Sequence, residues 1–367
     1  MTQWLTLAAL DTLFFRGPER FDAEAGGGAY LSSLFPPHPG TVYAALNSAL
    51  LNGAGLADDP AVEHEDGQRA RVGHHASSGP WLHHADHGVL LPAPLSLLAD
   101  EAGTVHVLRP SGPTYQTDLC NSGDVGHRVR LPTAPHAAQN VKTLEDAWLP
   151  VAAYQQWLNG LAPNKADLLY AKHLWALERH TGLARSRENH TAIESQLYSA
   201  AHVRPNSKVS LLVGLRNAAS GTPWPGASHM PLGGEGRAVW VDAAPVNTAL
   251  PGCATLAADK DGTLRYSLTL ITPGLGAAWG VAPGKPVREG VPGTVVCCAL
   301  GKPLRIGGFD TQMRMPERVR SARAAGSVWW MEAKQTDLDT VFKLHNTCIG
   351  AANSQGYGHV MVGAWPV

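Results

Sequence analysis

Apolar and polar residues alternate in part along residues 3–15, and no helix breaker interrupts them before Gly17. This period of two predicts a half-buried β-strand. The three glycines at 26–28 and the prolines of FPPHPG at 35–40 exclude regular structure from the segment that follows. Residues 41–51 then carry apolar side chains at helical spacing, which predicts the first helix. The chain therefore opens as a strand, a glycine-rich loop and a helix.

Longer apolar patterns follow in the middle of the chain. Residues 144–161 and 165–180 have helical spacing, and we expect two helices there. Strand patterns become dense after residue 195, in the segments SQLYSAAHVRP, KVSLLVGLR, RAVWVD and LRYSLTLITPG. Strands and a few helices on both sides of residue 206 predict an α+β fold.

Residues 52–140 have the weakest pattern of the chain, with turns, histidines and the acidic stretch GLADDPAVEHED. That stretch has five carboxylates and no Lys or Arg, so we expect an insertion with a solvated face. We expect an N-terminal domain at 1–205, with the insertion at about 52–140 and helices at about 144–180. A C-terminal domain with glycine-rich loops is expected at 206–367.

Length and composition are those of ordinary soluble globular proteins. The 367 residues are too many for one ordinary core and suit two domains. With 44% hydrophobic residues, 16% charged residues and a net charge of −1, the chain resembles neither disordered nor membrane proteins. A nearly neutral chain does not attract polyanions as a whole, so a nucleic-acid site must come from local clusters of basic residues.

Cysteine usage and the N-terminus both indicate the cytoplasm. The five cysteines are an odd set without a CxxC pair, which is typical of reduced, buried thiols. The apolar N-terminus lacks a basic segment, is broken by Asp11 and has no cleavage site of small residues, so we expect no secretory signal. No apolar run approaches the ~18 residues that a membrane span needs. We therefore expect a cytoplasmic protein that does not enter a membrane.

The strongest local charge bias lies in the segment KPLRIGGFDTQMRMPERVRSAR. Its basic residues exceed its carboxylates by four: they are Lys302, Arg305, Arg314, Arg318, Arg320 and Arg323. Glycine clusters at 232–237 and 356–365 add backbone that a phosphate can approach closely, although none has P-loop spacing. With Arg16 and Arg20, these features indicate a phosphate-backbone site. The alternative is that the glycines form hairpin turns and the arginines a solvated face.

Histidines gather in GHHASSGPWLHHADHG, which raises the alternative of a metal site. They are His74, His75, His83, His84 and His87, with Asp86 among them. Catalytic metal sites usually add carboxylates at a fixed spacing, and Gly79, Pro80 and Gly88 interrupt any helix that would align these residues. We favour a polar surface insertion and expect neither a metal nor another cofactor.

The sequence shows no constellation typical of catalysis. Candidates for acid–base chemistry are His38, His190, Tyr198 and His202, but spacing in one sequence does not bring them together. The carboxylates of DKDG at 259–262 are better explained by a hairpin turn than by a magnesium site. The chain also lacks Gly-x-Ser-x-Gly and His-Glu-x-x-His motifs. We therefore expect a protein that is not an enzyme.

Two adjacent tryptophans, Trp329 and Trp330, lie in a strand pattern. Side chains alternate across a regular strand, so we expect one of the two to face outward. An exposed tryptophan can stack a nucleic-acid base for ~1–3 kcal/mol. Packing under an insertion or against a partner subunit is the alternative.

Short motifs follow one another along the chain in a fixed order. They are DTLFFR (11–16) with glycines 26–28, FPPHP (35–39), RSRENHTAIESQLYSAAHVR, GGEGR (233–237), LITP (270–273), GGFD (307–310), AGSV (325–328) and GYGHVMVGAW (356–365). This series resembles the third Cmr subunit family of type III-B CRISPR effector complexes, a branch of the RAMP superfamily. The resemblance covers nearly the whole chain and is weakest at 52–140.

The resemblance implies two ferredoxin-like, RRM-related units packed together, without nuclease activity. It implies a subunit at the foot of an RNA-guided ribonucleoprotein of antiviral defence. Such a subunit holds the 5′ tag of the CRISPR RNA, pairs with the large polymerase-like subunit, contacts the first backbone RAMP subunit and meets target RNA indirectly. The RNA-binding residues that we expect are Arg16, Arg20, Arg237, Gly307, Gly308, Arg314, Arg318, Arg320 and Arg323.

A site for single-stranded RNA needs charge along the backbone and surfaces for unstacked bases, but no acid–base pair. The four arginines at 314–323 are therefore the leading candidates, and Arg237 is second because an arginine beside a glycine turn often only holds that turn. Two alternatives stay open. One is a RAMP-type endoribonuclease that processes precursor CRISPR RNA through a histidine or tyrosine, and the other is a tag-binding subunit of a sibling type III complex.

Overall fold

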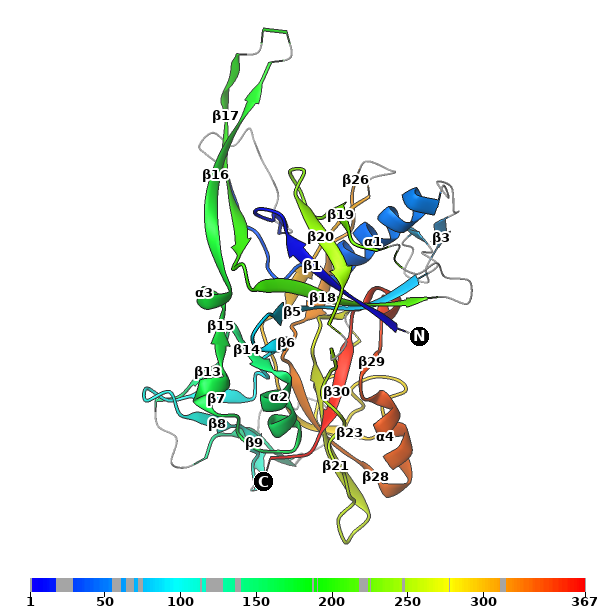
Figure 1. Cartoon of the computed structure of the whole chain (residues 1–367). Coiled ribbons are helices and arrows are strands. Elements are labelled where there is room, and N and C mark those ends of the chain that lie inside the picture. Colours follow the sequence, from blue (N-terminus) through cyan, green and yellow to red (C-terminus); the bar gives the residue numbers. More distant parts are fainter. Residues whose placement is uncertain are drawn as a thin grey trace.

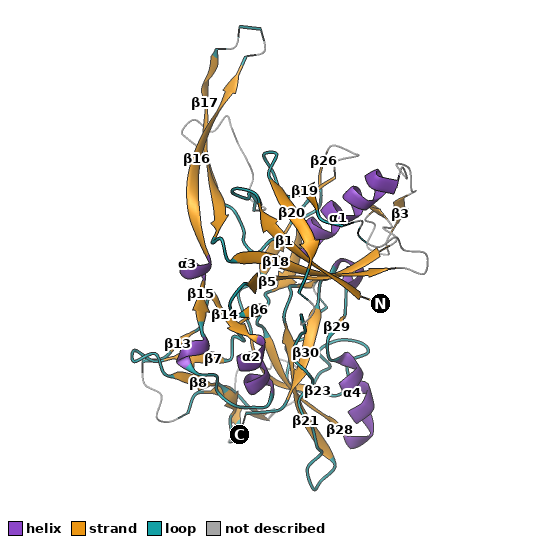
Figure 2. Ribbon diagram, in the orientation of Figure 1, coloured by secondary structure: helices purple, strands orange, loops and turns teal. Residues whose placement is uncertain are grey.

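The computed structural model describes residues 2–17, 29–54, 61–63, 69–71, 75–112, 114–116, 128–135, 140–186, 188–189, 191–217, 224, 226–245, 248–276, 278–310 and 315–366. Over these residues the chain has a mixed fold of many strands and few helices, as the sequence predicts (Figure 1). Figure 2 shows how far strands outnumber helices. Of the helices in the described part, none is long and apolar enough to cross a membrane.

The largest sheet of the described residues, here the large sheet, has eight strands. Their order is β15 (Leu169–Tyr170), β14 (Ala147–Pro150), β6 (Gly88–Pro92), β5 (His75–His84), β18 (Val209–Asn217), β1 (Thr2–Ala9), β20 (Ala238–Ala243) and β19 (Ser228–Pro231). The five-stranded sheet has the order β23 (Thr294–Ala299), β28 (Val328–Lys334), β21 (Thr263–Leu270), β30 (His359–Gly363) and β29 (Thr347–Cys348).

Two three-stranded sheets are important for the site. The hairpin sheet consists of β16 (Trp175–Arg185), β17 (Ala192–Pro205) and β2 (Ala29–Leu31), and the basic sheet of β22 (Gly274–Leu275), β27 (Arg320–Arg323) and β24 (Leu304–Ile306). The other strands are β3 (Ala61–Glu63), β4 (Arg69–Arg71), β7 (Leu97–Ala99), β8 (Val105–Val107), β9 (Arg109–Pro110), β10 (Tyr115–Gln116), β11 (Arg128–Val129), β12 (Pro132–Thr133), β13 (Lys142–Thr143), β25 (Phe309–Asp310) and β26 (Met315–Pro316).

Four α-helices are described, and α1 packs on the large sheet. They are α1 (Pro39–Ala54), α2 (Val151–Leu158), α3 (Ala171–Leu174) and α4 (Leu338–Leu344), and 3-10 helices lie at Lys165–Asp167, Gln335–Asp337 and Asn353–Gln355. Leu5 and Leu7 of β1 are buried in one core with Val42 and Leu46 of α1, as the alternation in the sequence predicts. Burying such a leucine contributes about 1.5–3 kcal/mol, so this layer fixes α1 on the sheet.

The five-stranded sheet is buried on both faces. Trp329 and Trp330 are adjacent on β28 and point to opposite faces, yet both are almost completely buried. Trp279 stacks on Trp329 with ring centroids 5.5 Å apart, and Trp329 Nε1 donates to the Gly280 carbonyl at 2.9 Å. The expectation that one of these two tryptophans faces outward is therefore wrong, because β28 is an inner strand with core on each side.

The hairpin formed by β16 and β17 extends away from the rest of the molecule (Figure 1). The helix predicted at 165–180 is therefore wrong over most of its length. Leu169–Tyr170 is a strand, only Ala171–Leu174 is α-helical, and residues 175–180 belong to the first strand of this hairpin. Leucines at 168, 169, 174 and 177 imitate helical spacing, but residues 175–185 pair with β17 through their backbone. The helix predicted at 144–161 is reduced to Val151–Leu158, because Ala147–Pro150 joins the large sheet.

Part of the predicted insertion belongs to the core. Residues 75–92 form β5 and β6, which are inner strands of the large sheet, and Trp81, Leu82, Leu90 and Leu91 are almost completely buried. Both faces of these strands are covered, so they lack the alternation of a half-buried strand. Strands before and after residue 206 pair in the same sheet. The division at that residue and the two ferredoxin-like units stay predictions.

Candidate nucleic-acid interface

Three segments meet at the base of the hairpin: the loop after β1, strand β17 and the turn at 233–237. Leu13 pairs with Val203 in an isolated antiparallel bridge, and the Gly234 amide donates to the Phe14 carbonyl at 2.8 Å. Gly233 has φ of 86°, and a side chain there would collide with the Phe14 carbonyl. The DTLFFR and GGEGR motifs are therefore partners in one contact, which the sequence alone does not reveal.

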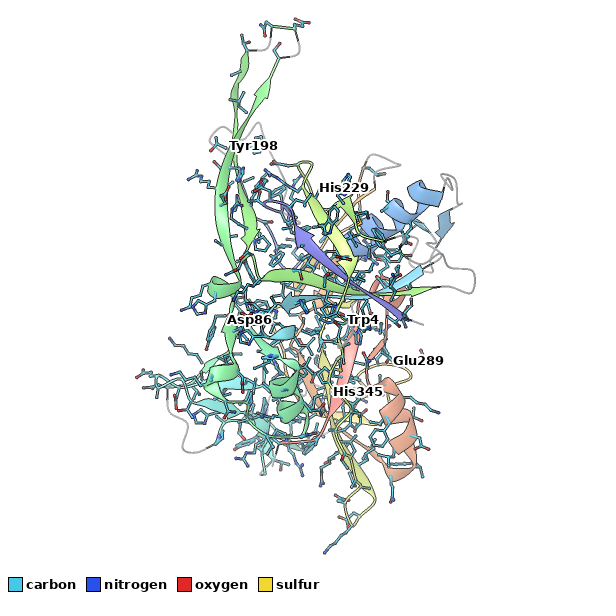
Figure 3. The ribbon with its side chains drawn as sticks, in the orientation of Figure 1. Trp4, Asp86, Tyr198, His229, Glu289 and His345 are labelled. Atoms are coloured by element: carbon cyan, nitrogen blue, oxygen red, sulfur yellow. The ribbon has the colours of Figure 1, made fainter. Side chains whose placement is uncertain are left out.

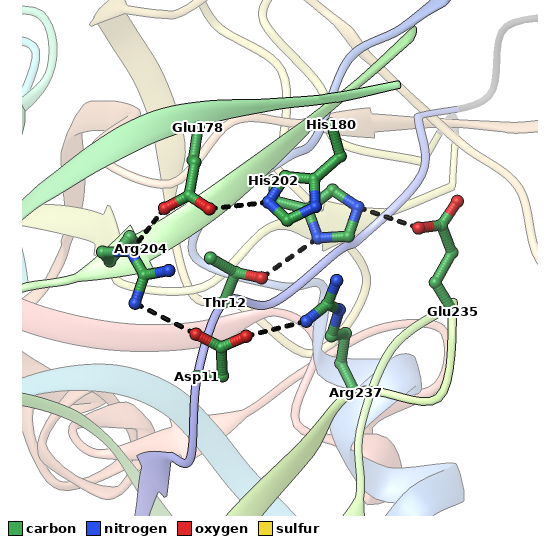
Figure 4. Close-up of polar contacts among 8 residues, drawn as sticks. All are labelled: Asp11, Thr12, Glu178, His180, His202, Arg204, Glu235 and Arg237. Atoms are coloured by element: carbon green, nitrogen blue, oxygen red, sulfur yellow. Dashed lines mark hydrogen bonds and ion pairs between the residues drawn. The ribbon is translucent and has the colours of Figure 1, made fainter. Parts of the chain in front are cut away.

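A chain of ion pairs joins the same three segments (Figure 4). Asp11 lies between two arginines: Arg204 Nη1 donates to Oδ1 at 3.0 Å, and Arg237 Nη1 donates to Oδ2 at 2.9 Å. Arg204 Nε also donates to Glu178 Oε2 at 2.5 Å. This hydrogen bond, together with one from His180, lowers the pKa of Glu178 to about 2. Arg237 thus binds Asp11 on another segment, whereas the sequence predicts that this arginine holds its own glycine turn.

Two stacked histidines fill the centre of this cluster. The ring of His202 stacks with those of Phe14 and His180, with centroid distances of 5.0 Å and 4.1 Å. His202 Nε2 is 2.9 Å from Glu235 Oε2, and its Nδ1 is 3.2 Å from Thr12 Oγ1. Burial lowers the pKa of His202, and the nearby charges of His180 and Arg237 act in the same direction. The shift favours the neutral form of this buried ring, while the Glu235 carboxylate acts in the opposite direction.

Tyr198 connects the hairpin to the glycine turn. Its hydroxyl donates to Glu235 Oε1 at 3.2 Å, and Figure 3 shows this tyrosine on the hairpin where it leaves the body. Gly182 lies directly opposite on β16, and a side chain at that position would collide with the Tyr198 ring. Burial raises the pKa of Tyr198, and the Glu235 carboxylate adds to the shift. The cluster fixes the direction of the hairpin relative to the body.

The structure brings together two of the acid–base candidates of the sequence, because Tyr198 and His202 both contact Glu235. The side chain of His202 is completely buried, and burial also lowers the pKa of His38, whose Nε2 is shielded from solvent. His190 lies outside the described residues. A buried imidazole cannot reach the 2′-hydroxyl of a bound RNA, so this arrangement gives no support to RNA cleavage by His202 or by Nε2 of His38.

The described part of the predicted basic segment supplies β24 and β27 of the basic sheet, one face of which is buried. In the register of β24 and β27, Arg305 lies opposite Ser321 on the same face as Arg323, whereas Arg320 lies opposite Ile306 on the face that contains the buried Ala322. Arg305 and Arg318 are exposed, and Arg320 and Arg323 are half-buried. Alternation along the strands therefore divides the arginines between two faces. It also adds Arg305, which contributes to the charge bias of the sequence but is not among the expected site residues.

A carboxylate lies beside the predicted glycine approach. The Glu317 amide donates to the Gly308 carbonyl at 2.9 Å, and a Cβ on Gly308 would lie 2.6 Å from Glu317 Oε2. Gly307 and Gly308 are both exposed, so the loop stays accessible from outside. Arg16 is exposed and pairs through its backbone with Ser33.

Two of the expected RNA-binding residues, Arg20 and Arg314, lie outside the described residues. Of the described members, Arg16 and Arg237 lie with the loop after β1 and the glycine turn. The others lie on the basic sheet or in the loop beside it: Gly307, Gly308, Arg318, Arg320 and Arg323. None of these placements tests RNA binding, which stays a prediction.

Most of the histidine-rich segment forms strand β5 of the large sheet. His84 is buried at the end of β5, with its ring centroid 4.8 Å from that of His87, and burial lowers its pKa. Asp86 accepts a hydrogen bond from Lys208 Nζ at 2.6 Å. Among the described side chains, no group of three His, Cys, Asp or Glu residues could hold a metal ion, while His74 lies outside them.

Comparison with known proteins gives one family and a set of solved structures. The family model for CRISPR-associated protein (Cas_Cmr3) matches residues 5–365. A chain in the cryo-EM structure of the Type III-B Cmr-beta bound to cognate target RNA is 14% identical, with a TM-score of 0.51 over 98% of this chain and 96% of that chain. A chain in the structure with cognate target RNA and AMPPnP, state 1, is 14% identical, with a TM-score of 0.50 over 93% of this chain and 89% of that one. No curated protein sequence matches. At these identities the solved structures show a shared fold.

Proposed function

The chain belongs to the Cas_Cmr3 family of CRISPR-associated proteins, and from that membership we propose that it is a non-catalytic RNA-binding subunit of a type III-B CRISPR effector complex. In this proposal it holds the 5′ tag of the CRISPR RNA at the foot of the complex, in the cytoplasm. It pairs there with the large polymerase-like subunit and contacts the first backbone RAMP subunit. Its two halves correspond to ferredoxin-like units.

The observation that carries this proposal is the family match over residues 5–365, which leaves almost no part of the chain outside it. The structures with the same fold come from Cmr complexes bound to target RNA, which supports a role inside an RNA–protein assembly. Two of the family-like motifs are also in contact, because DTLFFR and GGEGR meet at the hairpin base. Contacts that join distant segments of the chain are consistent with a structural subunit that supports RNA.

We propose that RNA phosphates contact the exposed arginines on and beside the basic sheet. Arg318 is the leading candidate, because it is exposed and precedes β27. Arg305 and Arg323 lie on one face of the sheet and can neutralise neighbouring phosphates. The remaining proposed contacts are Arg16, Arg20, Gly307, Gly308, Arg314 and Arg320, with Arg237 second because it already binds Asp11. Backbone contacts of this type give affinity without reading sequence.

Affinity purification of the tagged protein from its native host tests the assembly. We expect short RNAs that share one 5′ repeat-derived tag, together with a large polymerase-like subunit. Recovery of the protein without RNA would contradict the proposal. Incubation of the purified chain with repeat RNA in EDTA tests the endoribonuclease alternative, because specific cleavage under these conditions would assign the chain a catalytic role.

Charge reversal tests the RNA contacts directly. Arg318→Glu is expected to weaken binding of tag RNA and to lower the slope of log K against log salt by ~0.7 for each phosphate that the variant no longer neutralises. Lys343→Glu is the matched control, since this exposed lysine lies in α4, which packs on the core of the five-stranded sheet and not on that of the basic sheet. An Arg318→Glu protein that folds normally and keeps the wild-type slope removes this residue from the site.

A further inference from the structure

The hairpin sheet has two faces of different chemistry. Side chains alternate along β16, so Glu178 and His180 point to the inner face, which holds the cluster at the hairpin base. The other set points away from this cluster, and we call it the outer face. Its exposed members are Leu177, Arg179, Thr181 and Leu183 of β16 and Tyr30 of β2.

Tyr30 of β2 and Arg179 of β16 both lie on this outer face, with β17 between their strands. The register pairs Tyr30 with Ser199 of β17, and Ser199 with Thr181 of β16. Arg179 Nη2 donates to Ser199 Oγ at 3.1 Å, which directs the guanidinium toward the strand that lies beside Tyr30. Ser199 is itself almost completely buried, so it is a fixed anchor for the arginine. The guanidinium therefore reaches over β17, the strand that separates Arg179 from Tyr30, on the same surface as the phenol ring.

The tyrosine ring is open to solvent. Tyr30 is 57% exposed, although aromatic rings in strands usually pack against neighbours, and Leu177 and Leu183 are 63% and 49% exposed on the same face. An aromatic ring in this position offers a flat surface for stacking. The leucines extend the apolar surface along β16, where the hairpin leaves the body (Figure 1).

Charge selects the kind of partner for this surface. Arg179 is the one ionisable group, apart from the Tyr30 phenol, among the described side chains of the outer face. The carboxylates of the region, Glu178 and Glu235, are engaged on the inner face with Arg204 and with His202. A partner that offers one anionic group next to a flat ring matches this arrangement, and a nucleotide has both. A basic protein surface does not match it.

We propose that Tyr30 and Arg179 form a nucleotide subsite for single-stranded RNA on the outer face of the hairpin, where Tyr30 stacks a base and Arg179 binds its phosphate. This inference rests on the proposed RNA-binding function and adds a site separate from the basic sheet. Arginine suits the role because its planar group can contact two phosphate oxygens while Ser199 holds it in place. Leu177 and Leu183 contact the sugar or the next base.

Fluorescence anisotropy with the full chain and a labelled single-stranded tag RNA tests the subsite. Tyr30→Leu removes the ring and keeps apolar volume, and we expect binding to weaken roughly 5- to 150-fold, the range for loss of one stacked base. Tyr30→Phe keeps the ring and should bind as the wild type does. Arg179→Gln should weaken binding and lower the salt slope by ~0.7. Tyr115→Leu is the control, because Tyr115 is 41% exposed but lies in β10, outside the hairpin sheet.

Each outcome has a distinct meaning, once circular dichroism shows that the variants fold. Weaker binding by Tyr30→Leu but not by Tyr30→Phe or Tyr115→Leu supports the subsite. Wild-type affinity and salt slope in both Tyr30→Leu and Arg179→Gln overturn it and leave the proposed function intact. Loss of a co-purified protein without any change in RNA affinity also overturns it, in favour of a protein contact. If the wild-type chain and its native complex bind no RNA, the proposed function itself fails.

Discussion

His359 gives the most direct test of the described core, because its ring is almost completely buried and neutral. Its Nε2 donates to Asn346 Oδ1 at 2.8 Å, its ring contacts Trp81 edge-on, and its Nδ1 has no hydrogen-bond partner among the described residues. Protonation would place an unpaired N–H in the core. Burial accordingly lowers the pKa of His359 to about 3, and the nearby charges of Arg216 and His345 add to this shift.

The sign of the effect follows from the two pKa values. The unfolded chain has a histidine pKa of about 6.5, so it binds more protons than the folded chain between about pH 6.5 and about pH 3. The stability contributed by His359 is therefore present above about pH 6.5 and is lost as the pH falls. From about pH 7.5 to about pH 5, this one group should lower the free energy of unfolding by about 2 kcal/mol.

Urea unfolding followed by tryptophan fluorescence at several pH values measures this loss. His359→Gln keeps a donor for Asn346 and removes the titration, so its free energy of unfolding should fall about 2 kcal/mol less than that of the wild type over the same range. The other buried histidines remain in both proteins. His229→Gln is the control, because His229 is exposed on β19. A constant difference between wild type and His359→Gln at all pH values would refute the argument.

Two further predictions concern packing. Trp329→Ala should lower the free energy of unfolding by about 3–5 kcal/mol because it leaves a cavity beside Trp279, whereas Trp240→Ala on the exposed side of β20 should cost far less; urea unfolding compares them. Gly182→Val should displace the Tyr198 ring and raise amide hydrogen exchange in the hairpin, while Gly112→Ala, where an added Cβ would meet open space, should not. Equal exchange in both glycine variants would show that the ring contact does not hold the hairpin.

Alternation in the sequence predicts the strands that have one buried face. β20 lies where its apolar period places it, and α1 matches its helical spacing. Alternation does not reveal strands with two buried faces, because the apolar residues of β5 and β6 show no period of two. Helical spacing also misleads at 175–180, where the leucines fit a helix but pairing with β17 decides the structure. Apolar periodicity along the sequence indicates which face of an element is buried, but it does not indicate which strands pair.

The contacts of the site are even less visible in the sequence. Asp11 and Arg237 are 226 positions apart, and the pairing of β1 with β20 and the hydrogen bond between Gly234 and Phe14 bring them near each other. Residue type nevertheless allows the candidate RNA-binding arginines to be ranked. Arg237 ranks second because an arginine beside a glycine turn is expected to hold that turn. The structure gives that arginine a partner on another segment. It also adds Tyr30, whose exposure depends on pairing between β2 and β17.

The arginines of this chain therefore differ in what they can give to RNA. Arg204 and Arg237 already neutralise Asp11, and an incoming phosphate would have to compete with that carboxylate. Arg318 is exposed, and Arg179 is anchored by a neutral hydroxyl, so a phosphate meets no competing carboxylate at Arg179 among the described side chains of the outer face. A count of basic residues overestimates the RNA-binding charge for this reason. The salt dependence of binding should reflect arginines such as Arg318 and Arg179, which have no carboxylate partner in the contacts above. Only phosphate contacts that release counterions contribute to the slope.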